Sequence, residues 1–496
     1  MIAAAGRISI LTMWIVAGFI LRRLLTPEDF GVVVFATSIS LFLSRIYTWG
    51  FDDALLHRQD SEEKVASAHL MWQIRLAGVA LILAFVLSLF LNHFFGTPRQ
   101  VLHVLILLTA AKIIFVAGST PKVLLEKQQR IKSIIFVEVT GTFMSFVVAI
   151  TVAWLWPEHG VWALVAQRVV EIVLHAGGFW LINPTKIRRD VDPVISRWMI
   201  LDFGLPLWIG SCFFIVTFQL PNFLVGRMIG LAALGVYSTA FRFAELPRDL
   251  CAFLPRISSP VYARLQDDRI ALSEIFEKMQ GMLLRGIVIV VILIAMLIPD
   301  LIEMVGWADD WKDVVPLIRV LALFSICHAF FVNLPGVATV GLGMTKIQSK
   351  VQILQGVSIA ILCPALILAF RRIDILLAPF GAAIAMSVMV VVSTIALLWM
   401  IARHIDIHFG RMMLPPLVAG LGAAATGYGL DYLLQEQSPW MRVPLLFISI
   451  AFVYFVVLFL LEGRKLIRLM AEFCSLLFSS SDNQTDRTSA SLHDGR

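Results

Sequence analysis

Long apolar runs alternate with short polar breaks along the whole chain. A membrane-spanning helix needs about 20 mostly apolar residues, because it rises about 1.5 Å per residue across a hydrocarbon layer about 30 Å thick. Fourteen runs fit this requirement: 6–25, 30–52, 67–92, 101–121, 133–156, 160–182, 199–226, 231–255, 281–299, 314–337, 349–370, 376–402, 412–434 and 440–461. The pattern predicts an all-α polytopic membrane protein with about 14 transmembrane helices.

The longest polar breaks are residues 183–198, residues 256–280 and the segment after residue 462. Within the second break, apolar residues recur at helical spacing from Leu272 to Met279, with charged residues between them. This spacing predicts an amphipathic helix on the membrane surface. A similar pattern follows the last span, and the final residues are polar without periodicity, which is typical of disorder.

The amino-acid composition also indicates a membrane protein whose surface faces lipid. Apolar residues make up 59% of the chain and charged residues 15%, and the mean hydropathy is +0.87. The net charge of +6 lies in short clusters between apolar runs, which is typical of cytoplasmic loops and argues against nucleic-acid binding. Lys and Arg are concentrated in alternate loops, and this bias places both termini in the cytoplasm. The five cysteines are scattered and predict no disulfide framework.

A short sequence pattern near the first span recurs 204 residues later. Arg23 and Gly31 in the first copy correspond to Arg227 and Gly235 in the second, and an alanine follows each glycine at the same distance. Six predicted spans separate the copies, so both have the same orientation in the membrane. Parallel repeats of this kind are a known transporter design. Chance similarity between short Gly/Ala-rich membrane segments is the alternative.

The residues around these repeats carry a specific resemblance. The stretch "RRLLTPEDFGVVVFATS" resembles the hallmark near the N-terminus of Wzx-type polysaccharide repeat-unit flippases. The stretches "LAALGVYSTAFRFAELP", "FGLPLWIGS" and "SPVYARLQDD" are also similar to motifs of that family. These flippases belong to the multidrug/oligosaccharidyl-lipid/polysaccharide exporter superfamily.

The resemblance implies two six-helix lobes around a central cavity, two extra C-terminal helices and transport by alternating access. The implied substrate is an undecaprenyl-pyrophosphate-linked oligosaccharide that crosses the bacterial inner membrane. The implied partners are membrane lipid, a polysaccharide polymerase and a chain-length regulator. We expect an N-terminal lobe at 1–183, a cytoplasmic linker at 184–198, a C-terminal lobe at 199–402, two further spans at 403–462 and a cytoplasmic amphipathic helix with a disordered tail at 463–496.

Basic residues inside predicted spans are candidates for substrate binding. A charge within a span costs roughly 2.5–3.5 kcal/mol on insertion scales, so it tends to face a cavity or a partner. Arginine offers a bidentate fork to phosphate oxygens, which suits a pyrophosphate head group. The candidates are Arg45, Lys112, Arg168, Arg242 and Arg319.

Acidic residues and a histidine beside these bases are candidates for ion coupling. Arg168, Glu171 and His175 are spaced to share one helix face, and Arg242 and Glu245 repeat part of the spacing. One interpretation is an intrahelical ion pair that neutralises both charges for insertion. The other is a cluster that responds to protons or ions and couples transport to a gradient, with His175 titrating near neutrality.

Other function classes find less support. No nucleophile–base constellation and no phosphate-binding glycine loop occurs, so we expect neither an enzyme nor a cofactor. His404 and His408 have no third metal ligand nearby, so we expect no metal. A multidrug or cation antiporter on the same fold remains an alternative, although it would favour acidic residues deep in the N-terminal lobe. A membrane glycosyltransferase or polymer ligase is a weaker alternative, because the longest predicted periplasmic loop is short.

Overall fold

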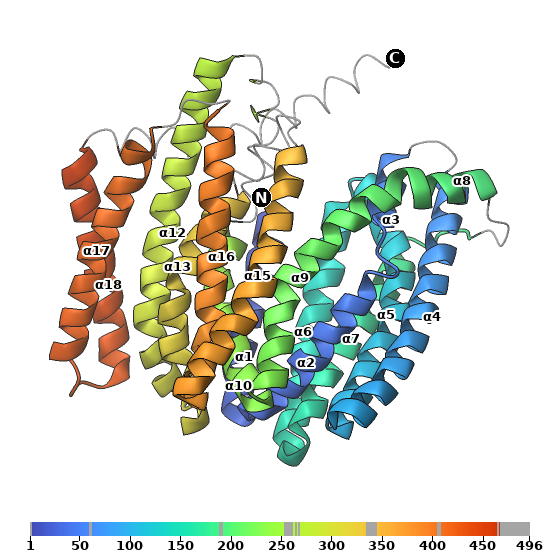
Figure 1. Cartoon of the computed structure of the whole chain (residues 1–496), viewed down its shortest axis with the longest axis horizontal. Helices are drawn as coiled ribbons and strands as arrows, with labels where there is room; N and C mark the ends of the chain where they lie inside the picture. The colour runs from blue at the N-terminus through green and yellow to red at the C-terminus, as the bar shows by residue number, and fades with distance from the viewer. Residues whose placement is uncertain are drawn as a thin grey trace.

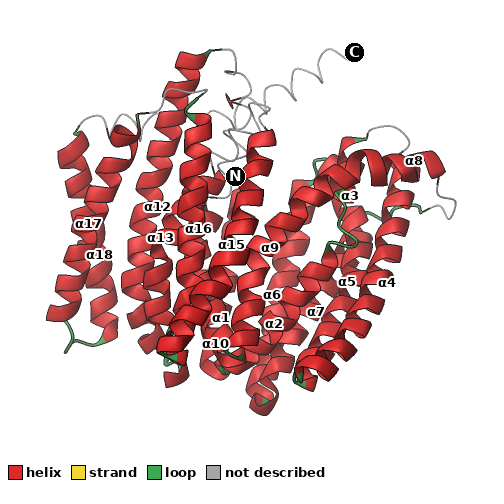
Figure 2. Cartoon of the chain, in the orientation of Figure 1, coloured by secondary structure: helices red, strands yellow, loops and turns green. Residues whose placement is uncertain are grey.

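The computed structural model describes residues 2–58, 62–187, 192–251, 261–262, 265, 268–333, 345–403, 408–463 and 466. Within these ranges every regular element is a helix, as predicted (Figure 2). Apart from residue 466, the predicted amphipathic segment after residue 463 and its tail lie outside the described residues, as does His404.

The first half of the chain forms one lobe of long helices. They are α1 (Ile2–Leu24), α2 (Pro27–Ser44), the short α3 (Phe51–His57), α4 (Glu62–Phe95), α5 (Arg99–Lys127), α6 (Ile131–Leu155) and α7 (Gly160–Ile182). A short helix α8 (Pro193–Arg197) and a π-helix (Trp198–Gly204) then lead into the second half. Figure 1 shows α4, α5 and α7 together at one side of the molecule.

The second half forms the other lobe and carries two further helices. Its members are α9 (Leu205–Met228), α10 (Leu231–Leu250), α12 (Arg269–Val305), α13 (Val314–Asn333), α15 (Thr345–Ile373), α16 (Ala378–Ile401), α17 (Phe409–Leu433) and α18 (Pro439–Glu462). The pair α17–α18 lies at the outer edge, beside α12 (Figure 1).

Twelve helices of the described chain are long and apolar enough to cross a membrane, so the protein is a multi-pass membrane protein. Helices α9 and α10 occupy two further predicted spans but are not among those twelve. Helix α10 carries Arg242, Glu245, Arg248 and Asp249 within its last turns, which lowers its hydropathy. The count of 14 spans stays a prediction, as do the boundaries of the lobes.

The predicted amphipathic segment does not form a separate helix where it is described. From Arg269 it continues into the next predicted span as the single 37-residue helix α12. Leu272 and Phe276 are buried, and Phe276 packs on the ring of Tyr262 at 6.2 Å between centroids. The apolar stripe that predicts a surface helix therefore faces protein instead.

The two lobes meet where α2 crosses α10, and the contact is reciprocal. A Cβ atom on Gly31 of α2 would lie 1.8 Å from the carbonyl oxygen of Leu231, the first residue of α10. A Cβ atom on Gly235 of α10 would lie 1.8 Å from the carbonyl oxygen of Pro27, the first residue of α2. Both pairs are related by the 204-residue offset of the sequence repeat. The repeated glycines thus allow the two backbones to touch about a pseudo-twofold axis.

Helix α18 is fixed to α12 by ion pairs near both of its ends. Near one end, Glu462 accepts hydrogen bonds from the guanidinium of Arg285, with Nε to Oε2 at 2.9 Å, and both side chains are buried. Near the other end, Arg442 lies 3.0 Å from the carboxylate of the buried Asp300 and also pairs with Asp431 of α17. The two extra helices are therefore a rigid part of the second lobe.

Candidate substrate-binding site

Trp14 of α1 lies close to two arginines that come from different lobes. The guanidinium of Arg168 on α7 is 4.6 Å from the centre of the Trp14 ring, and that of Arg242 on α10 is 5.9 Å from the same ring. Phe146 of α6 supports Trp14 by an edge-to-face contact at 4.9 Å. Such cation–π contacts hold a guanidinium without using up its hydrogen-bond donors.

Both arginines have acidic neighbours but keep part of the guanidinium accessible. Arg168 lies 3.4 Å from Glu171, and Arg242 lies 3.7 Å from Glu245 and 3.1 Å from Asp249. The two arginine side chains are 42% and 41% exposed, whereas Glu171 is only 15% exposed. The acids are thus covered and the bases open, so donors remain available to an anionic ligand.

Arg22 forms a third cationic position at this interface, and our sequence analysis missed it. Its guanidinium lies 4.7 Å from the ring centre of Phe30 and 5.7 Å from that of Trp307, and its Nε donates to Thr239 Oγ1 at 3.0 Å. In the described part of the chain Arg22 has no acidic partner. Its position at the end of the first apolar run suggests a loop residue, and only the fold brings the aromatic rings from the loop after α12 to it.

Lys112 of α5 belongs to the same electrostatic neighbourhood. It is half-buried, its ammonium lies 4.9 Å from the ring centre of Phe115, and it interacts electrostatically with Arg168 and Glu171. Three of the five predicted substrate-binding residues, Lys112, Arg168 and Arg242, therefore lie in one region.

The other two predicted substrate-binding residues lie elsewhere. Arg45 follows the last turn of α2, where its carbonyl oxygen accepts a hydrogen bond from Trp208 at 2.6 Å. Arg319 of α13 faces Tyr428 of α17, with 5.4 Å between its guanidinium and the ring centre. A single sequence gives no signal that separates these two from the central group, because all five are bases within apolar runs.

The predicted ion-coupling residues divide among separate partners. Glu171 accepts hydrogen bonds from Arg168 and from Gln167, the latter at 3.2 Å. His175 instead places its Nε2 atom 3.2 Å from the backbone oxygen of Glu138 on α6. Glu245 pairs with Arg248 at 3.0 Å in addition to Arg242. Sharing one helix face does not bring His175 to Glu171, and the coupling role of all three stays a prediction.

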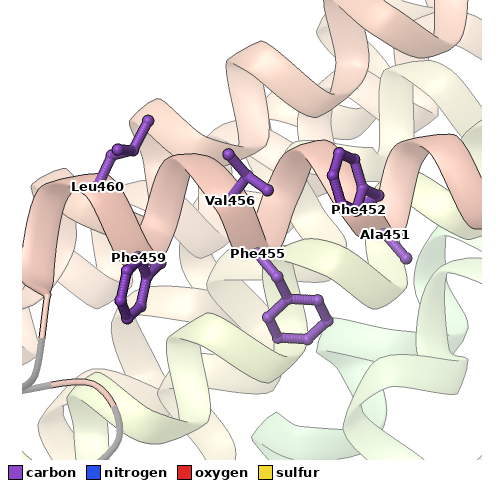
Figure 3. Close-up of a pocket in the computed structure, with 6 residues that line it drawn as sticks. All are labelled: Ala451, Phe452, Phe455, Val456, Phe459 and Leu460. Carbon is purple, nitrogen blue, oxygen red and sulfur yellow. The ribbon is translucent and has the colours of Figure 1, made fainter.

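Two cavities lie away from this region. One is lined by apolar side chains of α18 alone, from Ala451 to Leu460, and Figure 3 shows its aromatic members Phe452, Phe455 and Phe459. The other, about 830 Å³, lies beside the crossing of α2 and α10 and is lined by acids such as Glu28 and Asp309. Neither suits a pyrophosphate, because the first lacks charge and the second carries mostly negative charge. Within the described ranges, no three His, Cys, Asp or Glu residues are grouped to hold a metal.

The fold defines a multi-pass membrane protein of two pseudo-symmetric lobes. Comparison with known proteins agrees: the chain belongs to the polysaccharide biosynthesis protein family, whose family model matches residues 20–316. The resemblance predicted from the sequence motifs is thereby confirmed.

Two relatives and two solved structures are similar to the chain. It is 26% identical over 338 residues to the succinoglycan biosynthesis transport protein ExoT of Rhizobium meliloti (strain 1021), covering 64% of each protein. It is 24% identical over 432 residues to the teichuronic acid biosynthesis protein TuaB of Bacillus subtilis (strain 168), covering 83% of this chain and 84% of TuaB.

The lipid II flippase MurJ in an inward closed conformation shares the fold, with a TM-score of 0.70, 14% identity and coverage of 93% of this chain and 99% of MurJ. A multidrug resistance transporter of the MATE family in the MOP superfamily aligns with a TM-score of 0.54 and 15% identity, over 81% of this chain and 98% of that one. The predicted all-α fold is thus confirmed.

Proposed function

We propose that this protein is a flippase that moves an undecaprenyl-pyrophosphate-linked oligosaccharide from the cytoplasmic to the periplasmic leaflet of a bacterial inner membrane. The observation that carries the proposal is the pair Arg168 and Arg242, which come from opposite lobes and share the Trp14 ring. A pyrophosphate bound between them would contact both lobes at once. The names of ExoT and TuaB, a transport protein and a protein of polysaccharide biosynthesis, support a saccharide cargo.

The geometry suggests how binding and movement are linked. In the described conformation α2 and α10 touch backbone to backbone at Gly31 and Gly235. Alternating access requires this contact to separate, so we infer that it is the gate on the side opposite to substrate entry. A ligand that draws Arg168 toward Arg242 changes the relative position of the lobes that the gate joins.

An antiporter for drugs or cations fits less well. Such an antiporter would favour acidic residues within the spans of the first lobe, and there Glu138 and Glu171 already pair with Lys122 at 2.8 Å and with Arg168 at 3.4 Å. A membrane glycosyltransferase or polymer ligase would need catalytic groups that the cationic region does not offer. The polymerase and the chain-length regulator remain predicted partners.

Transport of a fluorescent undecaprenyl-pyrophosphate oligosaccharide in proteoliposomes tests the proposal. We expect Arg168→Gln or Arg242→Gln to slow transfer about 10- to 100-fold, because each charge-assisted hydrogen bond to phosphate contributes about 1.5–3 kcal/mol. Arg403→Gln is the matched control, because Arg403 also stacks on a tryptophan, Trp399 at 3.8 Å, but outside the cationic region.

The sequence alone predicts reduced polymer export for Arg45→Ala, Arg168→Ala and Arg319→Ala alike. The structure adds that Arg168→Ala has the largest effect of the three, since Arg45 and Arg319 lie apart from the cationic region. Normal transfer in both Arg168→Gln and Arg242→Gln, with both proteins inserted, would remove the cationic region from the mechanism.

A further inference from the structure

His69 of α4 is fully buried, and both of its ring nitrogens have hydrogen-bond partners. Nδ1 lies 2.9 Å from Thr120 Oγ1 of α5, and Nε2 lies 2.9 Å from Asp52 Oδ1 of α3. Gln73 Nε2 donates to the same carboxylate oxygen at 3.0 Å, and Ser119 donates to Gln73 Oε1 at 2.8 Å. This polar network joins three helices of the first lobe, and neither the cationic region nor the gate uses it.

The partners of His69 can satisfy the imidazole in two protonation states. When the neutral ring carries its proton on Nε2, Nε2–H donates to Asp52 and Nδ1 accepts from the hydroxyl of Thr120. The amide nitrogen of Gln73 also lies 3.2 Å from Nε2. In the charged ring both nitrogens donate, and the Thr120 hydroxyl rotates to accept, because a hydroxyl can serve in either role. Uptake of one proton therefore turns the hydrogen bond to Asp52 into an ion pair.

Protons can reach this buried pair through Asp52. The Asp52 side chain is 57% exposed, whereas that of His69 is not exposed at all. Partial desolvation of the carboxyl group raises its pKa, but the hydrogen bond and charge of His69, the amide of Gln73 and the charge of Lys122 outweigh that effect, so the pKa of Asp52 lies below its usual range.

The remaining charges around the network come from each element that packs there. They include Asp53, His57 and Arg58 on or just after α3, Lys64 on α4 with its partner Asp192 before α8, and Lys122 on α5 with its partner Glu138 on α6. Lys64 and Lys122 are thus paired with other acids, and Asp52 is the anion that contacts the imidazole.

The network is connected to the junction between the lobes. Helix α3 packs against the π-helix that precedes α9. Just before α3, Trp49 stacks on Trp208 of α9 with 5.2 Å between ring centres, and a Cβ on Gly204 would lie 2.5 Å from the carbonyl oxygen of Trp49. π-Helical turns occur frequently at functional sites. A shift of α3 would therefore move the first turn of the second lobe.

We propose that the Asp52–His69 pair is a proton-binding site whose occupancy is linked to the position of α9, so that the proton is the ion to which this transporter responds. The inference rests on the proposed flippase function only for its transport readout. Proton binding itself is a property of the chain that can be measured without a lipid-linked substrate.

Proton binding is tested by nuclear magnetic resonance of the full-length protein labelled with ¹⁵N-histidine. We expect one buried imidazole to change from the neutral to the charged form as the pH is lowered, because both of its nitrogens have partners that accept a hydrogen bond. That signal is absent in His69→Gln. In Asp52→Asn, the imidazole becomes charged only at a proton concentration at least tenfold higher than in the wild type. Thr120→Val, which removes the hydroxyl that serves both states, has the same direction of effect. A His69 ring that keeps one form from pH 5 to pH 8, or that titrates identically in Asp52→Asn, overturns the proposal.

Transport is measured separately in proteoliposomes at pH 6 and pH 8. We expect the wild-type rate to differ about tenfold between the two values and the rate of His69→Gln to be equal at both. The matched control is His408→Gln, because His408 also pairs with a carboxylate, Glu277 at 2.8 Å, but is 65% exposed. A pH response that persists in His69→Gln and vanishes in His408→Gln refutes the link to α9. No transfer at any pH, together with a titrating His69, contradicts the flippase function and leaves the proton site standing.

Discussion

Helices α2 and α10 are the two copies of one repeated unit, and they differ in an informative way. Both begin one turn before a glycine that touches the first residue of the other helix. Further along, α10 carries Arg242, Glu245 and Arg248, whereas α2 has Ser38, Leu41 and Ser44 at the corresponding positions. The copies thus share the residues that pack the lobes together and differ in the residues that carry charge.

The difference shows that the cationic region is not a product of the pseudo-twofold symmetry. The second arginine near Trp14 is Arg168, which belongs to α7 and not to α2, the other copy of the repeat. A lipid-linked sugar has no twofold symmetry, so a site that binds it gains nothing from symmetric charges. The symmetric contact can serve as a gate, while the asymmetric charges bind the cargo.

The second lobe also differs in carrying α17 and α18, and the largest expected effect concerns their attachment. Removing one member of a buried ion pair costs about 3–5 kcal/mol, because the remaining charge is left without its partner. We expect Glu462→Gln to lower the free energy of unfolding of the purified protein by about this amount, since Arg285 stays buried. Chemical unfolding in detergent, followed by circular dichroism, measures the change.

The control for this variant is Glu436→Gln, because Glu436 is exposed in the loop between the same two helices. Its effect should stay within about 0.5 kcal/mol. The double variant Arg285→Met with Glu462→Leu should recover most of the loss, because an apolar pair can replace a buried ion pair. If Glu462→Gln were as stable as Glu436→Gln, α17 and α18 would be loosely attached and the second lobe would end at α16.

The next effect concerns the contact that the two copies share. Gly31→Ala and Gly235→Ala should each destabilise the described conformation by about 1–3 kcal/mol, because the new methyl group overlaps a backbone carbonyl that has no freedom to rotate away. The two variants should have equal effects if the lobes are equivalent at the gate. Thermal unfolding of the two purified variants measures both.

Gly78→Ala and Gly286→Ala are matched controls for the first and the second lobe. Nothing lies within 4 Å of a Cβ at either position. Alanine in an open helix interior should stabilise these variants by up to about 1 kcal/mol. A loss confined to one of Gly31→Ala and Gly235→Ala would show that the symmetry of the sequence repeat does not extend to the energetics of the gate.

The sequence predicts the architecture well because lipid makes each span a nearly independent unit of length and hydropathy. It also predicts the repeat itself, since Gly31 and Gly235 lie 204 residues apart, but the packing role of the two glycines comes from the structure. The site is predictable only in part. Lys112, Arg168 and Arg242 come together through helix packing, and Arg22 is defined by Trp307, which lies 285 residues later in the chain. Local spacing contains no information on such long-range contacts, which also explains why His175 faces Glu138 rather than Glu171.

The smallest expected effect concerns the stability contributed by the segment that follows α2. There, Asp52 links α3 to α4, and the pKa of its carboxyl group lies below the value of about 3.9 that it has in an unfolded chain. The folded protein therefore favours the carboxylate, and its contribution to stability is fully present above about pH 4. That contribution is lost as the pH falls through the lower folded value, because protonation then removes the anion that His69 and Gln73 contact.

We expect wild type to exceed Asp52→Asn in the free energy of unfolding by about 1 kcal/mol at pH 7, the contribution of a partly exposed charge-assisted hydrogen bond. The difference should shrink steadily below about pH 4, and chemical unfolding across this range measures it. Asp53→Asn is the control, because burial and the nearby Asp52 raise the pKa of Asp53. A raised folded pKa means that the Asp53 carboxylate opposes folding near neutral pH, so Asp53→Asn should not destabilise at pH 7. Equal losses in both variants at pH 7 would mean that net charge, rather than the contact with His69, holds α3 in the first lobe.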